Sequence, residues 1–141
     1  MSTPTINIPS DWTEVAQSTP YAPAAFNFVD RGLAYTTNFI ANTHKTSEFE
    51  LDELQRHVTG QQLCMGLRDF AIECYGPFAP SVLRHWDVYR TDDFGSIVYH
   101  MADLKLLRTS PHDSIEDFRS VYDFDEAFHQ HELRECIGAF E

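Results

Sequence analysis

The residues of this chain that could do chemistry gather near its C-terminal end, in the segment DSIEDFRSVYDFDEAFHQH at residues 113–131. Six carboxylates and four aromatic rings are interleaved along it, and two histidines lie at its end. Such a segment could hold a metal ion, supply a pair of catalytic acids or bind another protein. The rest of the sequence decides between these three interpretations.

The spacing of the candidate ligands does not match a zinc site. Zinc is bound by closely spaced Cys or His pairs, and neither the seven histidines nor the three cysteines form one. His129 and His131 are two positions apart, so they share a face in a strand but not in a helix. With Asp125 they make only a weak candidate for a metal site. We expect the protein to use no metal and no cofactor.

His57, Arg68 and Asp69 form a second group of polar candidates, around the start of a strongly predicted helix. Beside a cavity they could act as acid, base and charge stabiliser, whereas on the surface they would be a capping-region imidazole and an ion pair. No nucleophile elbow or phosphate loop accompanies them, and the DFG at residues 93–95 lacks the other kinase motifs. We lean towards a protein that is not an enzyme. The alternative is a small enzyme or metal protein that uses His57, Arg68 and the C-terminal Asp and His groups.

Periodic apolar residues predict the helices that would position these groups. A long helix is expected near residues 23–40. Thr59 and Gln62 form a capping box that starts another helix, which Gly76 ends, and Thr91 caps a further one. The last two helices are expected to form the central packing pair. The side chains expected in the core are Leu67, Phe70, Trp86, Phe94, Ile97 and Met101.

The segments LLRTS and DFRSVYDF after these helices favour a small β-hairpin, although Ser114 could instead cap a helical turn. The predicted fold is therefore mainly α (α+β): a compact, winged-helix-like helical domain with a small C-terminal β-hairpin. We expect a single domain over residues 10–136, a flexible tail at residues 1–9 and a short tail at residues 137–141.

The charge balance narrows the class of partner. With 10 basic and 22 acidic residues, the formal net charge is −12, and such a surface repels phosphate backbones and anionic lipid. The helix after Thr91 also has no cation before Lys105 with which to read a DNA groove. No stretch approaches the ~20 apolar residues of a spanning helix, and the N-terminus lacks the features of a signal peptide. We expect no nucleic-acid partner, no membrane partner and a cytoplasmic location.

Alternation along a strand would turn the rings of the C-terminal segment inward and its carboxylates outward. The rings expected inside are Phe118, Tyr122 and Phe124. The carboxylates expected outside are Asp117, Asp123 and Asp125. The candidate interface consists of Asp117, Tyr122, Asp123, Asp125 and Phe128.

These observations favour a non-enzymatic protein-interaction or regulatory module. Its acidic surface would suit a basic protein partner, and a homo-oligomer is also compatible with the sequence. The alternative is that the negative charge only keeps the protein soluble.

Three stretches of the chain, residues 57–86, 91–101 and 113–128, together resemble a family of short proteins found mainly in planctomycetes and verrucomicrobia. The family pattern reads HV(S/T)GQ(E/Q)L, then (T/S)xDFGxIV, then DSxEDF and YDFxxAF. Upstream matches are Tyr21, Phe28, Val29, Leu33, Tyr35 and Thr36. The family has no assigned activity, so the resemblance implies no catalytic residue. It does imply that the acidic-aromatic segment is a family element.

Overall fold

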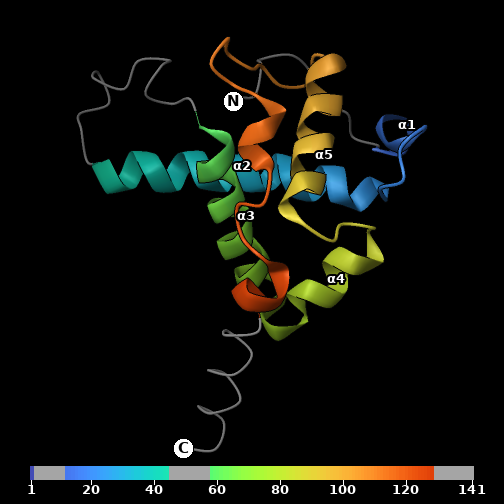
Figure 1. The fold of residues 1–141 in the computed structure, drawn as a ribbon, viewed down its shortest axis with the longest axis vertical. Coiled ribbons are helices and arrows are strands. Elements are labelled where there is room, and N and C mark those ends of the chain that lie inside the picture. Colours follow the sequence, from blue (N-terminus) through green and yellow to red (C-terminus); the bar gives the residue numbers. More distant parts are fainter. Residues whose placement is uncertain (2–11, 45–57, 129–141) are drawn as a thin grey trace, which may run out of the picture.

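The structure is a computed structural model that describes residue 1 and residues 12–44 and 58–128 (Figure 1). Within these ranges it contains five α-helices and two 3-10 turns. The helices are α1 (Thr13–Ala16), α2 (Pro23–His44), α3 (Gly60–Tyr75), α4 (Ala79–His85) and α5 (Thr91–Asp103), and the turns are η1 (Gly76–Phe78) and η2 (Ile115–Phe118). Residues 124–128 are also helical. The prediction of a mainly helical fold is confirmed.

Local signals in the sequence set where α3 begins and ends. The Thr59 hydroxyl accepts a hydrogen bond from the Gln62 N–H at 3.1 Å, and the Gln62 side chain accepts one from the Thr59 N–H at 2.9 Å. This is the predicted capping box. At the other end, Gly76 has a φ of 54°, a left-handed backbone that glycine adopts without a steric penalty. Both predicted ends of this helix are confirmed.

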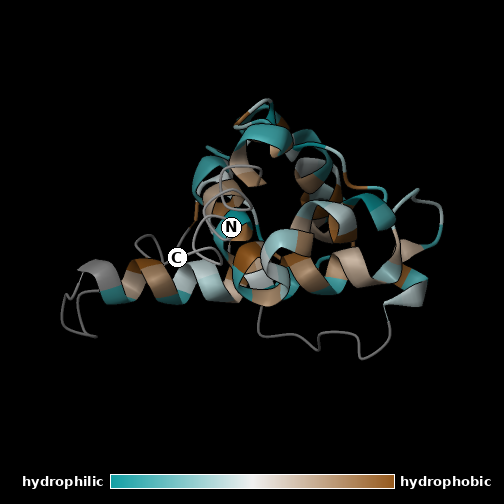
Figure 2. Ribbon diagram, turned by 90° about the horizontal axis from the view of Figure 1, so that it is seen from below, coloured by the Kyte–Doolittle hydropathy of each residue, from teal (hydrophilic) through white to brown (hydrophobic). Residues whose placement is uncertain are grey.

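The elements form three layers (Figure 1, Figure 2). α2 is the back layer, and α3 and α5 lie in front of it and pack against it. Residues 104–128 run over the front of α3 and α5, and η2 contacts both helices. Neither α2 nor any other helix in the described ranges is long and apolar enough to cross a membrane.

The contact between α2 and α3 is close because each helix has a glycine at the crossing. A Cβ atom on Gly66 of α3 would collide with the Thr36 side chain, and one on Gly32 of α2 would collide with Leu67. Thr36 is buried, and its hydroxyl donates to the Gly32 carbonyl oxygen at 2.7 Å. The distance between packed helices depends on the side chains between them, so the two glycines bring α2 and α3 together.

Aromatic side chains fill the core around Phe28 of α2. Its ring centroid lies 5.3 Å from that of Phe70 in α3, 5.5 Å from that of Trp86 after α4, and 6.4 Å from that of Phe94 in α5. Such ring pairs each add about 0.5–1.5 kcal/mol beyond the burial of their area, so Phe28 ties the back layer to three other elements. Of the side chains predicted to be buried, Phe70 is half-buried and the others are buried: Leu67, Trp86, Phe94, Ile97 and Met101.

The predicted central pair of helices is wrong. The sequence predicts that α3 and α5 form it, whereas the most extensive helix–helix contact joins α2 to α3, and α2 also packs on α5. The central helix is therefore α2. The physical reason is that an apolar stripe indicates which face of a helix is buried but not which helix covers it.

The predicted β-hairpin is also wrong, because residues 104–128 form turns and short helical segments and contain no strand. The Ser114 hydroxyl accepts from the Glu116 N–H at 3.2 Å, and the Asp117 carboxylate accepts from the Ser114 N–H at 3.2 Å. These bonds start η2, and local side-chain bonds of this kind compete with strand pairing. Without the hairpin, the predicted winged-helix-like outline lacks its wing in this part of the chain.

Most of the predicted domain limits fall outside the described residues. Of the predicted N-terminal tail, residues 1–9, the structure describes Met1, which is buried. The Met1 amino group donates to the Val58 carbonyl oxygen at 2.6 Å. The predicted domain end at residue 136 and the tail at 137–141 are not among the described residues.

Leu67 should be one of the side chains on which folding depends most. It is fully buried at the contact between α2 and α3, and truncation of an enclosed leucine leaves a cavity. We expect Leu67→Ala to lower the free energy of unfolding by about 2–5 kcal/mol in denaturant titrations. Gln61→Ala, at an exposed position of the same helix, should change it by less than about 0.5 kcal/mol. Equal effects of the two changes would mean that the buried face of α3 is misassigned.

Candidate functional site

Phe118 anchors the acidic-aromatic segment to the body of the protein. Its ring is fully buried between the first turn of α3 and the first half of α5. A Cβ atom on Gly95 would lie 2.8 Å from Phe118 Cβ, and one on Gly60 would lie 2.7 Å from Asp117 Cβ. Real Cβ contacts are not this short, so both glycines are needed to admit the segment. The Tyr99 ring packs edge-on against Phe118, with centroids 6.4 Å apart.

Side chains from the first turn of α5 hold the backbone that follows Phe118. The Thr91 hydroxyl accepts from the Val121 N–H at 3.1 Å, and the Asp92 carboxylate accepts from the Ser120 N–H at 3.1 Å. Thr91 is fully buried. The bond from Val121 is partly buried and the bond from Ser120 is exposed. Because an N–H that loses its partner on burial is destabilising, the Thr91 hydroxyl is the acceptor that contributes more to holding the segment in place.

The Asp93 carboxylate, also in the first turn of α5, accepts a separate set of hydrogen bonds. It accepts hydrogen bonds from the Tyr21 hydroxyl at 2.7 Å, from the Tyr89 N–H at 2.8 Å and from the Arg90 N–H at 3.2 Å. Burial and the bond to Asp93 raise the pKa of Tyr21 to about 12. The carboxylate of the DFG motif is therefore a structural acceptor in this protein.

The rings at the end of the segment pack inward. The Tyr122 hydroxyl donates to the Cys64 carbonyl oxygen at 2.7 Å, and burial raises the Tyr122 pKa well above its ordinary value. The Phe124 centroid lies 5.7 Å from that of Phe94 and 5.4 Å from that of Phe128. Phe124 and Phe128 are buried, and Tyr122 is half-buried. The rings predicted inside, Phe118, Tyr122 and Phe124, do face the core. They reach it through turns rather than a strand.

The Asp113 carboxylate at the start of the segment is nearly buried, 3.8 Å from the Met1 amino group, whereas most of the later carboxylates point to solvent. Asp123 and Asp125 are exposed as predicted, while Asp117 is half-buried. The Asp123 carboxylate accepts from the Asp125 N–H at 2.9 Å and so caps the helical residues 124–128. With Phe128 in the core, this face presents exposed carboxylates and no exposed ring over residues 113–128. Buried aromatic anchors carry most of the energy of a protein interface, and this candidate interface offers none.

Of the polar candidates His57, Arg68 and Asp69, the structure describes Arg68 and Asp69. Arg68 donates to one carboxylate oxygen of Asp69 through Nε at 3.2 Å and through Nη2 at 3.0 Å. Both side chains are partly exposed, so the pair is a surface ion pair of small energetic weight. His57, His129 and His131 lie outside the described residues. Over the described ranges, no group of three or more His, Cys, Asp and Glu side chains could hold a metal ion.

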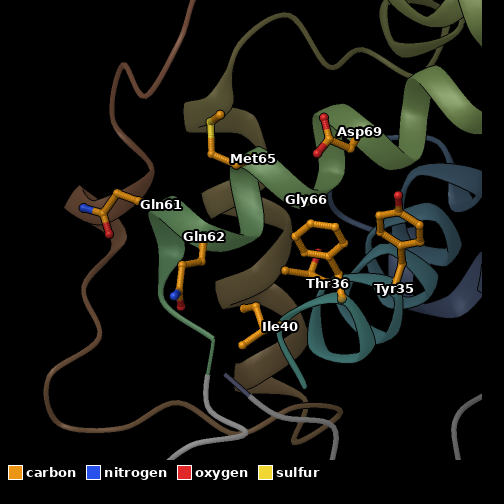
Figure 3. Close-up of a pocket in the computed structure, with 9 residues that line it drawn as sticks. Tyr35, Thr36, Ile40, Gln61, Gln62, Met65, Gly66 and Asp69 are labelled. Carbon is orange, nitrogen blue, oxygen red and sulfur yellow. The ribbon is translucent and has the colours of Figure 1, made fainter. Parts of the chain in front are cut away.

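A groove lies between the second half of α2 and the first half of α3 (Figure 3). It encloses about 310 Å³. Thr36 and Gly66, the residues of the helix crossing, are part of its wall. Within the described residues, the lining is Tyr35, Thr36, Phe39 and Ile40 from α2, with Gln61, Gln62, Met65, Gly66 and Asp69 from α3.

The parts of α2 and α3 beside the groove carry little charge. Residues 32–43 and residues 58–67 contain no charged side chain, although 23% of the chain is charged. Met65 is 41% exposed and Phe39 is 58% exposed. Among the described residues, Asp69 is the one charged member of the lining, and Arg68 pairs with it. The sequence analysis did not find this site. The gap in charge was the signal that could have found it.

No family model, curated protein or solved structure matches the chain. The resemblance to a family of short proteins therefore stays a prediction, and the function must be argued from the geometry of the chain itself.

Gly95 should tolerate no side chain. Alanine is a better helix former than glycine by about 1 kcal/mol, but its Cβ would press on Phe118 Cβ at 2.8 Å. We expect Gly95→Ala to lower the free energy of unfolding by about 1–3 kcal/mol, measured by denaturant titration. Ser96→Ala, at the exposed neighbouring position, is the control and should be neutral. In a double-mutant cycle, Phe118→Ala should relieve part of the Gly95→Ala loss; strictly additive losses would contradict the contact.

Cys64 and Cys74 should differ sharply towards thiol reagents. Cys64 is fully buried, and burial raises its pKa to about 12, whereas Cys74 is exposed. In a Cys136→Ser background, we expect native protein to be alkylated at Cys74 at least ~100-fold faster than at Cys64, as measured by peptide mass spectrometry. Denaturant should abolish the difference. Rapid labelling of native Cys64 would mean that the segment carrying Tyr122 does not stay packed on α3.

Proposed function

We propose that this chain is a non-enzymatic protein-interaction module that binds its partner in the groove between α2 and α3. The observation that carries the proposal is the exposure of Met65 beside a concave surface on which the described lining holds a single charged residue, Asp69. The centres of protein interfaces are poor in charge and rich in aromatic residues and Met. A groove between two helices also suits an apolar helix face, which is a common mode of peptide recognition.

The exposed carboxylates of residues 113–128, called the acidic face below, have a different role in this proposal. They include Glu116, Asp123, Asp125 and Glu126, and no ring is available beside them to be buried. Charges at the rim of an interface change the rate of association more than the affinity. A basic partner would therefore be attracted to this face but would gain little by docking there.

The alternative of a small enzyme is weaker because the polar side chains that could perform chemistry already have other partners. Thr91, Asp92 and Asp93 accept hydrogen bonds from backbone N–H groups, and the Tyr122 hydroxyl donates to a backbone carbonyl oxygen. Arg68 and Asp69 pair with each other at the surface. These contacts support a scaffold role for the motifs that the sequence singles out.

The test is quantitative affinity capture from a lysate of the source cells, with the tagged wild type compared with two variants. Met65→Glu places a carboxylate in the groove, and Asp123→Asn with Asp125→Asn removes charge from the acidic face while asparagine still caps the helical turn. We expect Met65→Glu to lose at least ~90% of the captured partner, since an unpaired charge buried in an interface costs several kcal/mol. The double Asn variant should keep it.

Two results would contradict the proposal. Loss of the partner in the double Asn variant, with retention in Met65→Glu, would move the binding surface to the acidic face. Capture of no protein by the wild type, in gentle salt and with the chain shown to be folded, would remove the interaction module altogether.

A further inference from the structure

We infer that the amino group of Met1 occupies a binding site in the fold, so that acylation or extension of this group loosens both the start of α3 and the start of the acidic-aromatic segment. The site is formed by Val58, just before α3, and by Asp113. The inference is independent of the groove between α2 and α3 and of the function proposed for it.

Met1 and Val58 pair through their backbones. The Met1 amino group donates to the Val58 carbonyl oxygen at 2.6 Å, and the Val58 N–H donates to the Met1 carbonyl oxygen at 3.4 Å. Facing residues of antiparallel strands exchange the same two bonds. The two residues are 57 positions apart in the chain. Bringing them together costs chain entropy, so these contacts must offset that cost.

The paired residues are enclosed. Met1 has no exposed surface, and Val58 is buried beside it. The Met1 side chain belongs to the same buried apolar cluster as Leu63 of α3 and Phe94 of α5. Burial of a methionine side chain is favourable, so apolar contact as well as hydrogen bonding holds the amino end in place.

The Asp113 carboxylate completes the site. Its Oδ2 atom lies 3.8 Å from the Met1 nitrogen, and only 5% of its side chain is exposed. The same atom accepts a hydrogen bond from the Ser110 N–H at 2.8 Å, so the turn at residues 110–113 fixes its position. Capture of an amino end by backbone groups is a recurring mode of peptide recognition, and here the captured end belongs to the chain itself.

Burial changes the protonation of the bound amine. It lowers the pKa of the Met1 amino group from its usual 8.0 to about 6, although the Asp113 carboxylate opposes the change. The amine is therefore largely uncharged at neutral pH. Its hydrogen bonds and its packing, rather than a full ion pair, are what acylation or extension would disturb.

The site joins two caps that start separate elements. Val58 immediately precedes Thr59, the N-cap of α3, and Asp113 immediately precedes Ser114, the N-cap of η2. An acyl group or an extra residue on the Met1 nitrogen needs space that a closely packed site does not offer. Displacement of Met1 would therefore be felt at both caps.

The first test is the rate of acetylation of Met1 by an N-hydroxysuccinimide ester at neutral pH, followed by peptide mass spectrometry. The amine nitrogen forms an amide bond to the acetyl carbon, and N-hydroxysuccinimide leaves with the amine proton. We expect native Met1 to react at least ~100-fold more slowly than Met1 in denaturant, because the reagent must wait for local opening. The exposed Lys105 is the internal control and should react at similar rates in both. Rapid labelling of native Met1 overturns the inference.

The second test is denaturant titration of the full chain, released from a cleavable fusion so that it begins either at Met1 or at one glycine placed before Met1. We expect the added glycine to lower the equilibrium constant for folding at least ~10-fold, since overfilling an enclosed site is destabilising. An unchanged constant overturns the inference.

A double-mutant cycle tests the role of Asp113. Asp113→Asn keeps an oxygen that can accept from the Ser110 N–H, but it removes the charge beside Met1. In this background the added glycine should cost less than in the wild type. Asp103→Asn, at an exposed carboxylate of α5, is the matched control and should leave the full effect of the glycine. Strictly additive losses with Asp113→Asn would contradict the assignment of Asp113 to the site.

The last measurement is the mass of the N-terminal peptide of the protein isolated from its source cells. We expect this peptide to begin at Met1 and to carry an unmodified amine. A native chain that begins before or after Met1 overturns the inference, because its amino group could not then be the one that pairs with Val58.

Discussion

The close approach of α2 and α3 at Gly66 and Thr36 is the constraint on which the other contacts depend. A side chain at Gly66 would force the two helices apart. Because α3 also provides the Gly60 notch for Phe118 and the backbone acceptor for Tyr122, its position sets the position of the whole front layer. Gly66 thus sets the spacing of the three layers. Because a packed interior transmits strain, a displacement of α3 would be passed on to the elements packed on it.

Two populations with different physical roles can be distinguished among the described acidic residues. One population accepts backbone N–H groups at helix starts and turns: Asp92 and Asp93 at α5, Asp117 at η2 and Asp123 before residues 124–128. The other, which includes Glu116, Asp125 and Glu126, is exposed and contributes to the negative charge of the surface. A carboxylate that accepts backbone N–H groups replaces the water it would otherwise bind, so the first population can be structural without being deeply buried.

The sequence predicts several features that depend on neighbours in the chain, although the prediction that Thr91 caps α5 is wrong, because the N-cap is Arg90 and the Thr91 hydroxyl accepts from the Val121 N–H. The capping box of Thr59 and Gln62 and the stop at Gly76 are local, and each is found as predicted. The position of α2 as the central helix is not a local feature, because the apolar stripe of a helix does not indicate which other helix packs against it. The turn at Ser114 was one of two open alternatives, and the structure selects it because the Asp117 carboxylate completes the cap. The groove could not be predicted, since it exists only once two helices have been placed.

The groove and the core arise from the same crossing. Two helices that touch closely at one point diverge on either side of it. On one side of Gly32 and Gly66 the gap is filled by rings, with Phe28 and Phe70 only 5.3 Å apart between their centroids. On the other side the helices diverge with Met65 partly exposed, and a hollow is left. The two helices therefore pack tightly at the crossing, and the same crossing produces both the aromatic contact on one flank and the hollow on the other.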